Sequence, residues 1–121
     1  MNDYCLPHSD KYQTLQDALD FAKPGQFLAN VDLKSAYRSV AINDVDYCLT
    51  GVQWTFECES PTYKFDTLLP FGSRLGPMIF HRLSQAVRRF MANRGFASIT
   101  VYLDDYFIVA DTFQEIGRAH V

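Results

Sequence analysis

The spacing of apolar and polar positions changes several times along the chain, and each change marks a predicted element. Apolar residues recur every three or four positions in two segments, which predicts helices over residues 14–22 and 77–93. Thr14, with Asp17 three positions later, can cap the first helix, and Pro77 suits the first turn of the second. Short runs of apolar, β-branched and aromatic residues predict five strands. These strands cover residues 26–32, 49–56, 62–65, 98–103 and 106–110.

The helix predicted over residues 77–93 carries one apolar stripe, which we expect to face the core of the domain. The members of this stripe are Ile79, Leu83, Ala86, Val87, Phe90 and Met91. Polar residues lie away from the stripe, namely His81, Arg82, Gln85, Arg88 and Arg89. Upstream, Asn43 can cap a single helical turn over residues 43–47.

Composition agrees with an ordinary globular domain. The 121 residues are 48% hydrophobic and 21% charged, which excludes a disordered tail and a collagen-like repeat. No apolar run approaches the roughly 20 residues that span a bilayer, and the N-terminus lacks the segments of a secretory signal. We therefore expect an intracellular protein, cytoplasmic or nuclear, with no membrane partner. Cys5, Cys48 and Cys58 are odd in number and lack CxxC spacing, which predicts reduced thiols.

Charge is distributed unevenly along the chain, although the net charge is only −3. Residues 67–103 contain no Asp or Glu and carry +5, whereas the remainder carries −8. The five positive charges are Arg74, Arg82, Arg88, Arg89 and Arg94. A basic block beside carboxylates suggests a polyanionic ligand on one side and metal cations on the other, and the alternative is a solvated basic helix face.

Three carboxylates, Asp32, Asp104 and Asp105, each lie where a predicted apolar strand ends. An anion beside a hydrophobic strand is costly unless something compensates it, and adjacent carboxylates also repel each other. Mg²⁺ is a suitable compensation, and two such ions about 4 Å apart can stabilise both oxygens of a phosphoryl transfer. The alternative interpretation is a polar hairpin turn at Asp104 and Asp105, with Asp32 capping the next turn.

Three short motifs closely resemble the reverse transcriptase family, in that family's order and approximate spacing. They are VDLKSAY at residues 31–37, LPFG at 69–72 and YLDD at 102–105. In detail, VDLKSAYRSV and LPFGSRLGP are most similar to retrotransposon enzymes, of the tyrosine-recombinase type or another group like the long-terminal-repeat elements. The resemblance implies an α+β fold, the reverse-transcriptase palm, in which an antiparallel sheet is backed by helices. It also implies an incomplete domain.

The resemblance assigns roles to the carboxylates and to the segment after the first of them. Asp32 and Asp104 become the main metal ligands, with Asp105 as the third member of the catalytic set. Leu33 also lies at the metal, and the backbone of four successive residues holds the triphosphate. These residues are Leu33, Lys34, Ser35 and Ala36.

The remaining implied roles concern the nucleotide and the nucleic acid. Tyr37 matches the family's sugar gate, whose ring beneath the sugar collides with a 2′-hydroxyl, so that deoxynucleotides are preferred. Phe71 contacts the incoming nucleotide, and Gly72 lets the backbone approach the template base pair. Arg74 and Tyr102 are expected to contact nucleic acid.

The activity implied is RNA-templated, and also DNA-templated, DNA synthesis from deoxynucleoside triphosphates on a primer, with two Mg²⁺ ions or Mn²⁺ in their place. The thumb, the primer grip and any ribonuclease H region are missing, so we expect little or no polymerase activity from the chain in isolation. Two alternatives remain open: a non-catalytic retroelement remnant with weak or no nucleic-acid binding, and a metal-dependent nuclease, which has no need of a sugar gate at Tyr37.

We expect two regions in the chain: residues 1–114, a palm with partial fingers, and residues 115–121, a non-native tail. The tail EIGRAHV can be back-translated into codons that resemble the opening of a common sequencing adapter. The last strand is therefore expected to end near Ala110, with a frayed tail after it.

Overall fold

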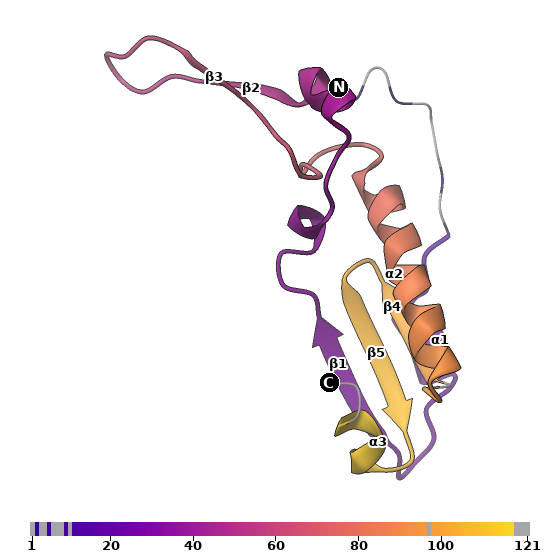
Figure 1. Cartoon of the computed structure of the whole chain (residues 1–121). Helices are drawn as coiled ribbons and strands as arrows, with labels where there is room; N and C mark the ends of the chain where they lie inside the picture. Colours follow the sequence, from indigo (N-terminus) through magenta and orange to yellow (C-terminus); the bar gives the residue numbers. More distant parts are fainter. Residues whose placement is uncertain (1, 3–4, 6–8, 10, 97, 118–121) are drawn as a thin grey trace. The chain divides into compact units, whose positions relative to one another are not determined.

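The computed structural model describes residues 2, 5, 9, 11–96 and 98–117. The chain divides into two compact units, which we describe separately: unit 1 is Met1–His8 with Ser35–Pro77, and unit 2 is Ser9–Lys34 with Met78–Val121. The elements in chain order (Figure 1) are α1 (Leu15–Leu19), β1 (Phe27–Asp32), the 3₁₀ helices η2 (Ala36–Ser39) and η3 (Asp44–Thr50), β2 (Gly51–Trp54), β3 (Thr62–Phe65), α2 (Gly76–Asn93), β4 (Ser98–Tyr102), β5 (Asp105–Ala110) and α3 (Phe113–Gly117).

Unit 2 is built on a three-stranded antiparallel sheet with the order β1-β5-β4. The hairpin β4–β5 places β5 in the centre, and β1 and β4 form the two edges (Figure 1). In this register, Asp32 at the end of β1 lies opposite Asp105 at the start of β5. The predicted α+β fold is therefore confirmed, with the YLDD hairpin beside the strand that ends at Asp32.

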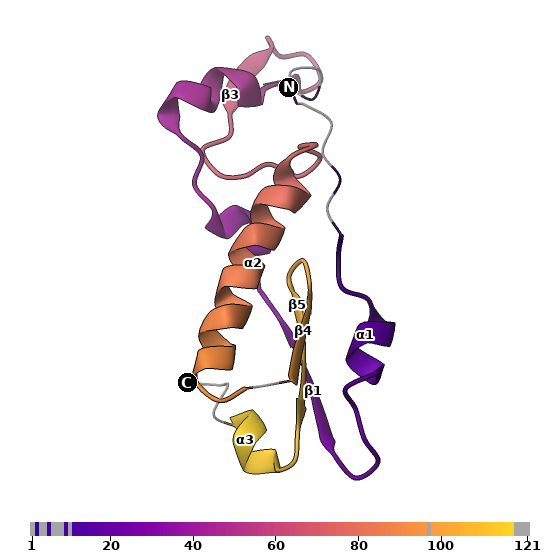
Figure 2. The same ribbon diagram turned by 90° about the vertical axis from the view of Figure 1, so that its right-hand side faces the viewer.

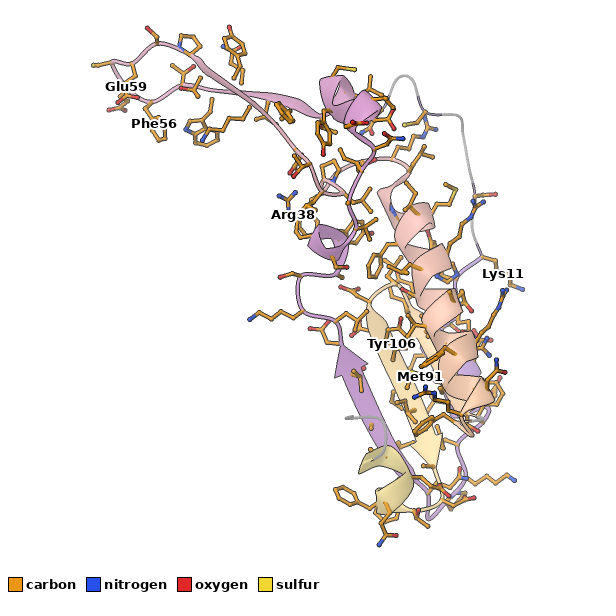
Figure 3. All side chains as sticks on the ribbon, viewed as in Figure 1. Lys11, Arg38, Phe56, Glu59, Met91 and Tyr106 are labelled. Atoms are coloured by element: carbon orange, nitrogen blue, oxygen red, sulfur yellow. The ribbon has the colours of Figure 1, made fainter. Side chains whose placement is uncertain are left out.

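One face of this sheet forms the core of unit 2, and α2 lies along it (Figure 2). The buried residues of the sheet on this face come from the two hairpin strands: Ile99, Val101, Tyr106 and Ile108. Val87 and Met91 of α2 pack against them, and Figure 3 marks Met91 and Tyr106 in this layer. Side chains alternate between the two faces of a strand, so this packing leaves Asp105 and Phe107 of β5 on the opposite face.

The side of α2 that is buried differs from the prediction. Phe80, His81 and Ser84 are buried, with Val87 and Met91 packed against the core. The remaining members of the predicted core stripe are exposed, namely Ile79, Leu83, Ala86 and Phe90. The helix has two apolar faces, and the prediction chose the wider one because Ser84 and His81 interrupt the other.

Local hydrogen bonds explain how Ser84 and Arg88 of α2 tolerate their burial. The Ser84 hydroxyl donates to the carbonyl of Phe80 at 3.0 Å, so it needs no water. Arg88, predicted to lie away from the core, is half-buried because its Nε donates to the carbonyl of Ile99 on β4 at 2.8 Å. This hydrogen bond between a charged donor and a carbonyl of β4 compensates for part of the free energy that burial of the guanidinium costs.

Tyr106 links α2 to the sheet, and its burial predicts alkaline sensitivity. Its hydroxyl donates to the Ser84 carbonyl at 3.4 Å, and burial raises the pKa of that hydroxyl, an effect that the hydrogen bond to Ser84 partly offsets. Because the pKa of Tyr106 is raised in the folded state, the contribution of the buried, neutral side chain to the free energy of unfolding depends on pH. This contribution is fully present below about pH 10, the pKa of tyrosine in the unfolded chain, and is lost as pH rises through the folded pKa. We expect Tyr106→Phe to cost about 1 kcal/mol at neutral pH and to remove part of the alkaline loss. Urea unfolding from pH 7 to 11 measures both effects, and an alkaline loss that is identical in wild type and variant contradicts the assignment.

Two short helices complete unit 2. The predicted cap of α1 is confirmed: the amide of Asp17 donates to Thr14 Oγ1 at 3.3 Å and the Thr14 amide donates to Asp17 Oδ2 at 2.6 Å. The predicted frayed tail is wrong for α3, where Ile116 is buried. Here the amide of Glu115 donates to Thr112 Oγ1 at 3.3 Å, which starts the helix. Residues 118–121 lie outside the described part of the chain.

Unit 1 contains the hairpin β2–β3, whose register pairs Gly51 with Phe65 and Trp54 with Thr62. The first strand is shorter than predicted because η3 extends to Thr50, whose hydroxyl donates to the carbonyls of Tyr47 and Asp66. Cys48 and Cys58 of this unit are exposed. In the described residues, no helix combines the length and the apolar character that crossing a membrane requires.

Candidate active site

The backbone of unit 2 brings the three predicted carboxylates to one end of the sheet. Asp32 and Asp105 are register partners on β1 and β5. One step beyond this pair, the amide of Leu33 donates to the carbonyl of Asp104 at 3.2 Å. The backbone hydrogen bonds between β1 and β5 therefore continue past the ends of the strands into the β4–β5 turn. They fix the position of the Asp104 backbone relative to that of Asp32.

The side chains of the three carboxylates have different surroundings. Residues directly opposite in an antiparallel pair project from the same face, so Asp32 and Asp105 share one face of the sheet. Both are exposed, whereas Asp104 is half-buried. Asp104 and Leu103 form the two-residue turn, and Leu103 has a left-handed backbone with φ of 53°.

The donor chemistry of this end of the sheet fits a divalent cation. Carboxylate oxygens of Asp32, Asp104 and Asp105 and the backbone carbonyl of Leu33 are hard donors, which Mg²⁺ and Mn²⁺ both accept. Within residues 2, 5, 9, 11–96 and 98–117, however, no three His, Cys, Asp or Glu side chains are grouped closely enough to hold a metal ion. The backbone positions suit a metal site, and the side chains as they stand do not form a closed set of ligands.

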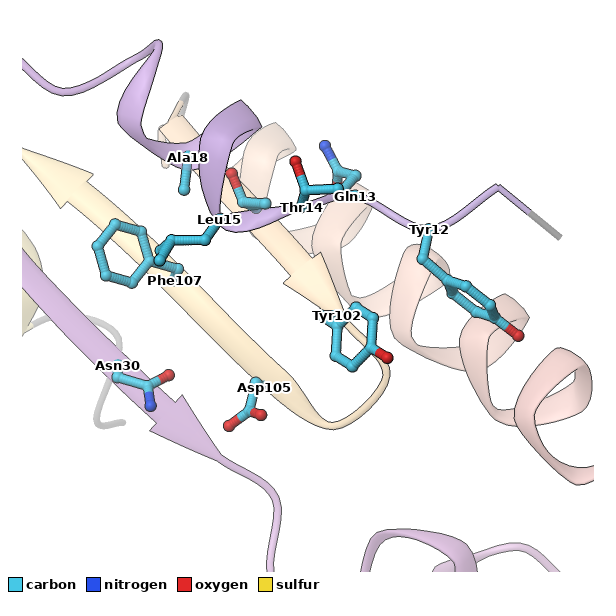
Figure 4. A pocket seen from close by; sticks show the side chains of 10 residues that line it. Tyr12, Gln13, Thr14, Leu15, Ala18, Asn30, Tyr102, Asp105 and Phe107 are labelled. Atoms are coloured by element: carbon cyan, nitrogen blue, oxygen red, sulfur yellow. The ribbon is translucent and has the colours of Figure 1, made fainter.

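A cavity of about 570 Å³ lies on the face of the sheet that carries Asp105 (Figure 4). Its floor is formed by strand residues and its wall by the segment that leads into α1. Tyr102 and Asp105, both predicted site residues, line it. The other lining residues are Tyr12, Gln13, Thr14, Leu15, Ala18, Asn30, Thr100 and Phe107.

The segment before α1 was not predicted to belong to the site. Gln13 fastens it to the sheet, because the amide of Val101 on β4 donates to Gln13 Oε1 at 3.1 Å. Tyr12 lies between two rings, with centroids 4.8 Å from His81 and 5.8 Å from Tyr102. Helical periodicity begins only at Thr14, so the sequence offered no pattern from which the roles of Tyr12 and Gln13 could be inferred.

In unit 1, the structure brings together the two predicted nucleotide contacts Tyr37 and Phe71. Their ring centroids are 5.2 Å apart with planes tilted by 34°. Gly76 leaves room for Tyr37, since a Cβ added at this glycine would lie 3.1 Å from Tyr37 Cε1. A side chain at position 76 would therefore displace the Tyr37 ring.

The loop after Phe71 is held by Asn2, which the sequence analysis did not single out. The Asn2 side-chain amide donates to the Gly72 carbonyl at 2.9 Å, and the Arg74 amide donates to Asn2 Oδ1 at 2.8 Å. Gly72 has a positive φ of 82°, a conformation that favours glycine. The Arg74 side chain is exposed, as a contact to nucleic acid requires.

The predicted triphosphate segment crosses the boundary between the units. Leu33 and Lys34 belong to unit 2, while Ser35 and Ala36 belong to unit 1. Ser35 adopts a left-handed backbone with φ of 57°, and Ala36 is buried at the start of η2.

In a comparison with known families, a family model matches the chain over residues 2–121. The matching family is described as "Reverse transcriptase (RNA-dependent DNA polymerase)". The match includes the segments with Asp32, Phe71 and Asp104. No curated protein matches the chain.

Proposed function

Because the chain belongs to the reverse transcriptase family, we propose that it supplies the palm and part of the fingers of a retrotransposon RNA-directed DNA polymerase. The observation that carries the proposal is the pairing of Asp32 with Asp105, beside the bond between Leu33 and Asp104. Asp32 thereby reaches the same end of the sheet as Asp104 and Asp105, more than 70 residues later in the sequence. A polymerase needs such a concentration of anionic oxygens, whereas a structural turn does not.

Enzymes of this family use divalent metal ions. In the proposed site, Asp32, Asp104 and Asp105 would hold two Mg²⁺ ions with the help of the Leu33 carbonyl. The ions would supply activation of the attacking hydroxyl and charge neutralisation on the phosphate oxygens.

The proposed reaction is nucleotidyl transfer. The primer 3′-oxygen forms a bond to the α-phosphorus of a deoxynucleoside triphosphate, the bond to the β-phosphate oxygen breaks, and pyrophosphate leaves with the electron pair. The hydroxyl proton passes to solvent or to the leaving group. The protein's part is positioning: the backbone of residues 33–36 binds the triphosphate, and Tyr37 and Phe71 hold the sugar and base.

A primer-extension assay tests the proposal. The restored full-length enzyme is incubated with a primed RNA or DNA template and Mg²⁺, with or without deoxynucleotides. We expect extension only when deoxynucleotides are present, and little or no extension by the 121-residue chain alone. Degradation of the primed template without nucleotides would instead indicate a nuclease, and inertness of the full-length enzyme would indicate a non-catalytic remnant.

Replacing the proposed sugar gate gives a prediction on selectivity. We expect Tyr37→Val in the full-length enzyme to weaken discrimination against ribonucleotides by about tenfold to a hundredfold, because a smaller side chain no longer collides with the 2′-hydroxyl. The ratio of kcat/KM for a deoxynucleotide and its ribonucleotide measures the effect. Tyr63→Val, the same change at an exposed position of β3, is the matched control. An unchanged ratio in Tyr37→Val contradicts the assignment.

A further inference from the structure

Tyr102 lies at the end of β4 beside the carboxylates, and its side chain is 53% exposed. In the register of the hairpin it lies opposite Asp105, and it directly precedes the turn formed by Leu103 and Asp104. An exposed ring at the end of a strand can change its rotamer, and fixing it when a ligand binds costs conformational entropy. A contact that already holds this ring in the free protein therefore favours binding.

The ring of Tyr12, on the segment that leads into α1, makes such a contact (Figure 4). The ring centroids of Tyr12 and Tyr102 are 5.8 Å apart and their planes meet at 65°, the edge-to-face arrangement that aromatic pairs prefer. At the neighbouring position of both segments, the amide of Val101 donates to Gln13 Oε1 at 3.1 Å. The segment with Tyr12 is thus fastened to β4 directly beside the ring contact.

Tyr12 also contacts His81 of α2, with ring centroids 4.8 Å apart and planes at 77°. His81 is only 8% exposed, so its ring has little room to move. Its Nε2 lies 3.5 Å from Gln85 Nε2, and Gln85 Oε1 accepts from Arg88 Nη1 at 3.5 Å. Because the oxygen of the Gln85 amide faces Arg88, its nitrogen faces His81 and sets the plane of the ring against Tyr12.

These contacts form a closed chain that begins and ends on β4. Arg88 Nε donates to the carbonyl of Ile99 at 2.8 Å, three residues before Tyr102. From Arg88 the contacts pass through α2 to the segment before α1 and return to β4 at Tyr102. All members of this chain belong to unit 2, namely Ile99, Arg88, Gln85, His81, Tyr12 and Tyr102.

Stability alone does not explain the histidine in this chain of contacts. His81 Nδ1 is buried and has no hydrogen-bond partner among the described residues. A buried polar atom without a partner costs free energy, which an apolar ring at this position would avoid. What the histidine adds is the contact of its Nε2 with Gln85, which orients the ring that Tyr12 meets.

We propose that Tyr12 is a positioning residue for nucleotidyl transfer: its ring, oriented by His81, holds Tyr102 in the rotamer that receives the primer–template duplex. The inference rests on the proposed function and deepens it, because Tyr12 acts through Tyr102. Fixing the Tyr102 ring before the duplex binds reduces the entropy that binding costs, so the effect falls on affinity for the duplex and not on the chemical step. A residue that only fills space between α1 and the sheet has no such effect.

A double-mutant cycle in the full-length enzyme tests the proposal. The variants are Tyr12→Leu, Tyr102→Leu and the two together, since leucine keeps apolar bulk and circular dichroism verifies folding. We expect Tyr12→Leu to raise the KM for the primed template by about threefold to tenfold and to leave kcat nearly unchanged. The double variant should be no worse than Tyr102→Leu, because without the Tyr102 ring Tyr12 has nothing to hold. Tyr12→Phe keeps the ring and should match the wild type, as should the control Tyr63→Leu at an exposed position of β3.

Nuclear magnetic resonance on the 121-residue chain, with labelled tyrosine rings, gives a readout that does not depend on activity. We expect cross-relaxation between the ring protons of Tyr12 and Tyr102. In Tyr12→Leu, but not in Tyr12→Phe, the Tyr102 ring resonances should shift toward those of free tyrosine. Absence of the cross-relaxation in the wild type, or Tyr102 resonances that Tyr12→Leu does not move, overturns the proposal.

The kinetic results can overturn the proposal separately from the proposed function. An active wild type in which Tyr12→Leu leaves KM unchanged overturns this inference alone. So do losses that multiply in the double variant, which would show that Tyr12 acts independently of Tyr102, and a Tyr12→Phe variant as impaired as Tyr12→Leu. An inert wild-type full-length enzyme overturns the proposed function and this inference with it.

Discussion

Primer extension is expected to fall by at least about a thousandfold when Asp32 or Asp104 of the full-length enzyme is replaced by Asn. Asparagine keeps the shape of the side chain but removes the charge that holds a divalent ion, so the loss falls on chemistry and not on folding. Binding of the template–primer duplex should change little, because phosphate contacts by basic residues dominate that affinity. Single-turnover extension and filter binding measure the two quantities separately.

A matched control separates loss of a metal ligand from a general effect of removing a carboxylate. Asp46→Asn makes the same change at an exposed residue of η3, and full extension is expected. Near-normal extension by Asp32→Asn or Asp104→Asn would refute the assignment. Extension that is lost in all three variants would show that the assay responds to net charge.

Ile108→Ala is expected to lower the free energy of unfolding by about 2–5 kcal/mol. Ile108 is 1% exposed at the centre of the core cluster with Ile99, Val101 and Tyr106. Removing its side chain leaves a cavity beneath the strand that carries Asp105, and the rigid β5 cannot collapse to fill it. A loss of this size is a large fraction of the stability of a small domain.

Urea unfolding followed by circular dichroism measures this loss. Leu28→Ala is the control, since Leu28 is an apolar residue of the same sheet that is 52% exposed on the other face. We expect Leu28→Ala to cost less than about 1 kcal/mol. If the two variants lose the same free energy of unfolding, Ile108 does not belong to the core of unit 2.

The strands and the position of the carboxylates were predictable from the sequence because the information is local. The run before Asp32 and the two runs around Asp104 and Asp105 are continuous in β-forming residues, and a two-residue connection leaves an antiparallel hairpin as the natural outcome. The spacing of the motifs, through the family resemblance, then suggested that Asp32 lies beside the hairpin. The observed register agrees with this.

What the sequence did not reveal depends on tertiary contacts. Helix α2 has two apolar faces, and the local pattern cannot tell which of them meets the sheet; Ser84 and His81 made the buried face look polar. Gln13 acts through a hydrogen bond to Val101, 88 positions away, and Asn2 acts through hydrogen bonds to Gly72 and Arg74, 70 and 72 positions away. A polar side chain that holds a distant backbone amide carries no periodic pattern, so only the folded chain identifies it.

The outer edge of β1 has a practical consequence for work on this chain. Within the part of the chain that the structure describes, residues 27–32 pair with β5 on one side only, and the strand contains neither proline nor lysine. Natural sheets protect such edges with these residues, because unpaired amide and carbonyl groups otherwise recruit strands from neighbouring molecules. Overproduction is therefore expected to yield inclusion bodies, and a solubilising fusion partner with a low induction temperature is the appropriate starting point for purification.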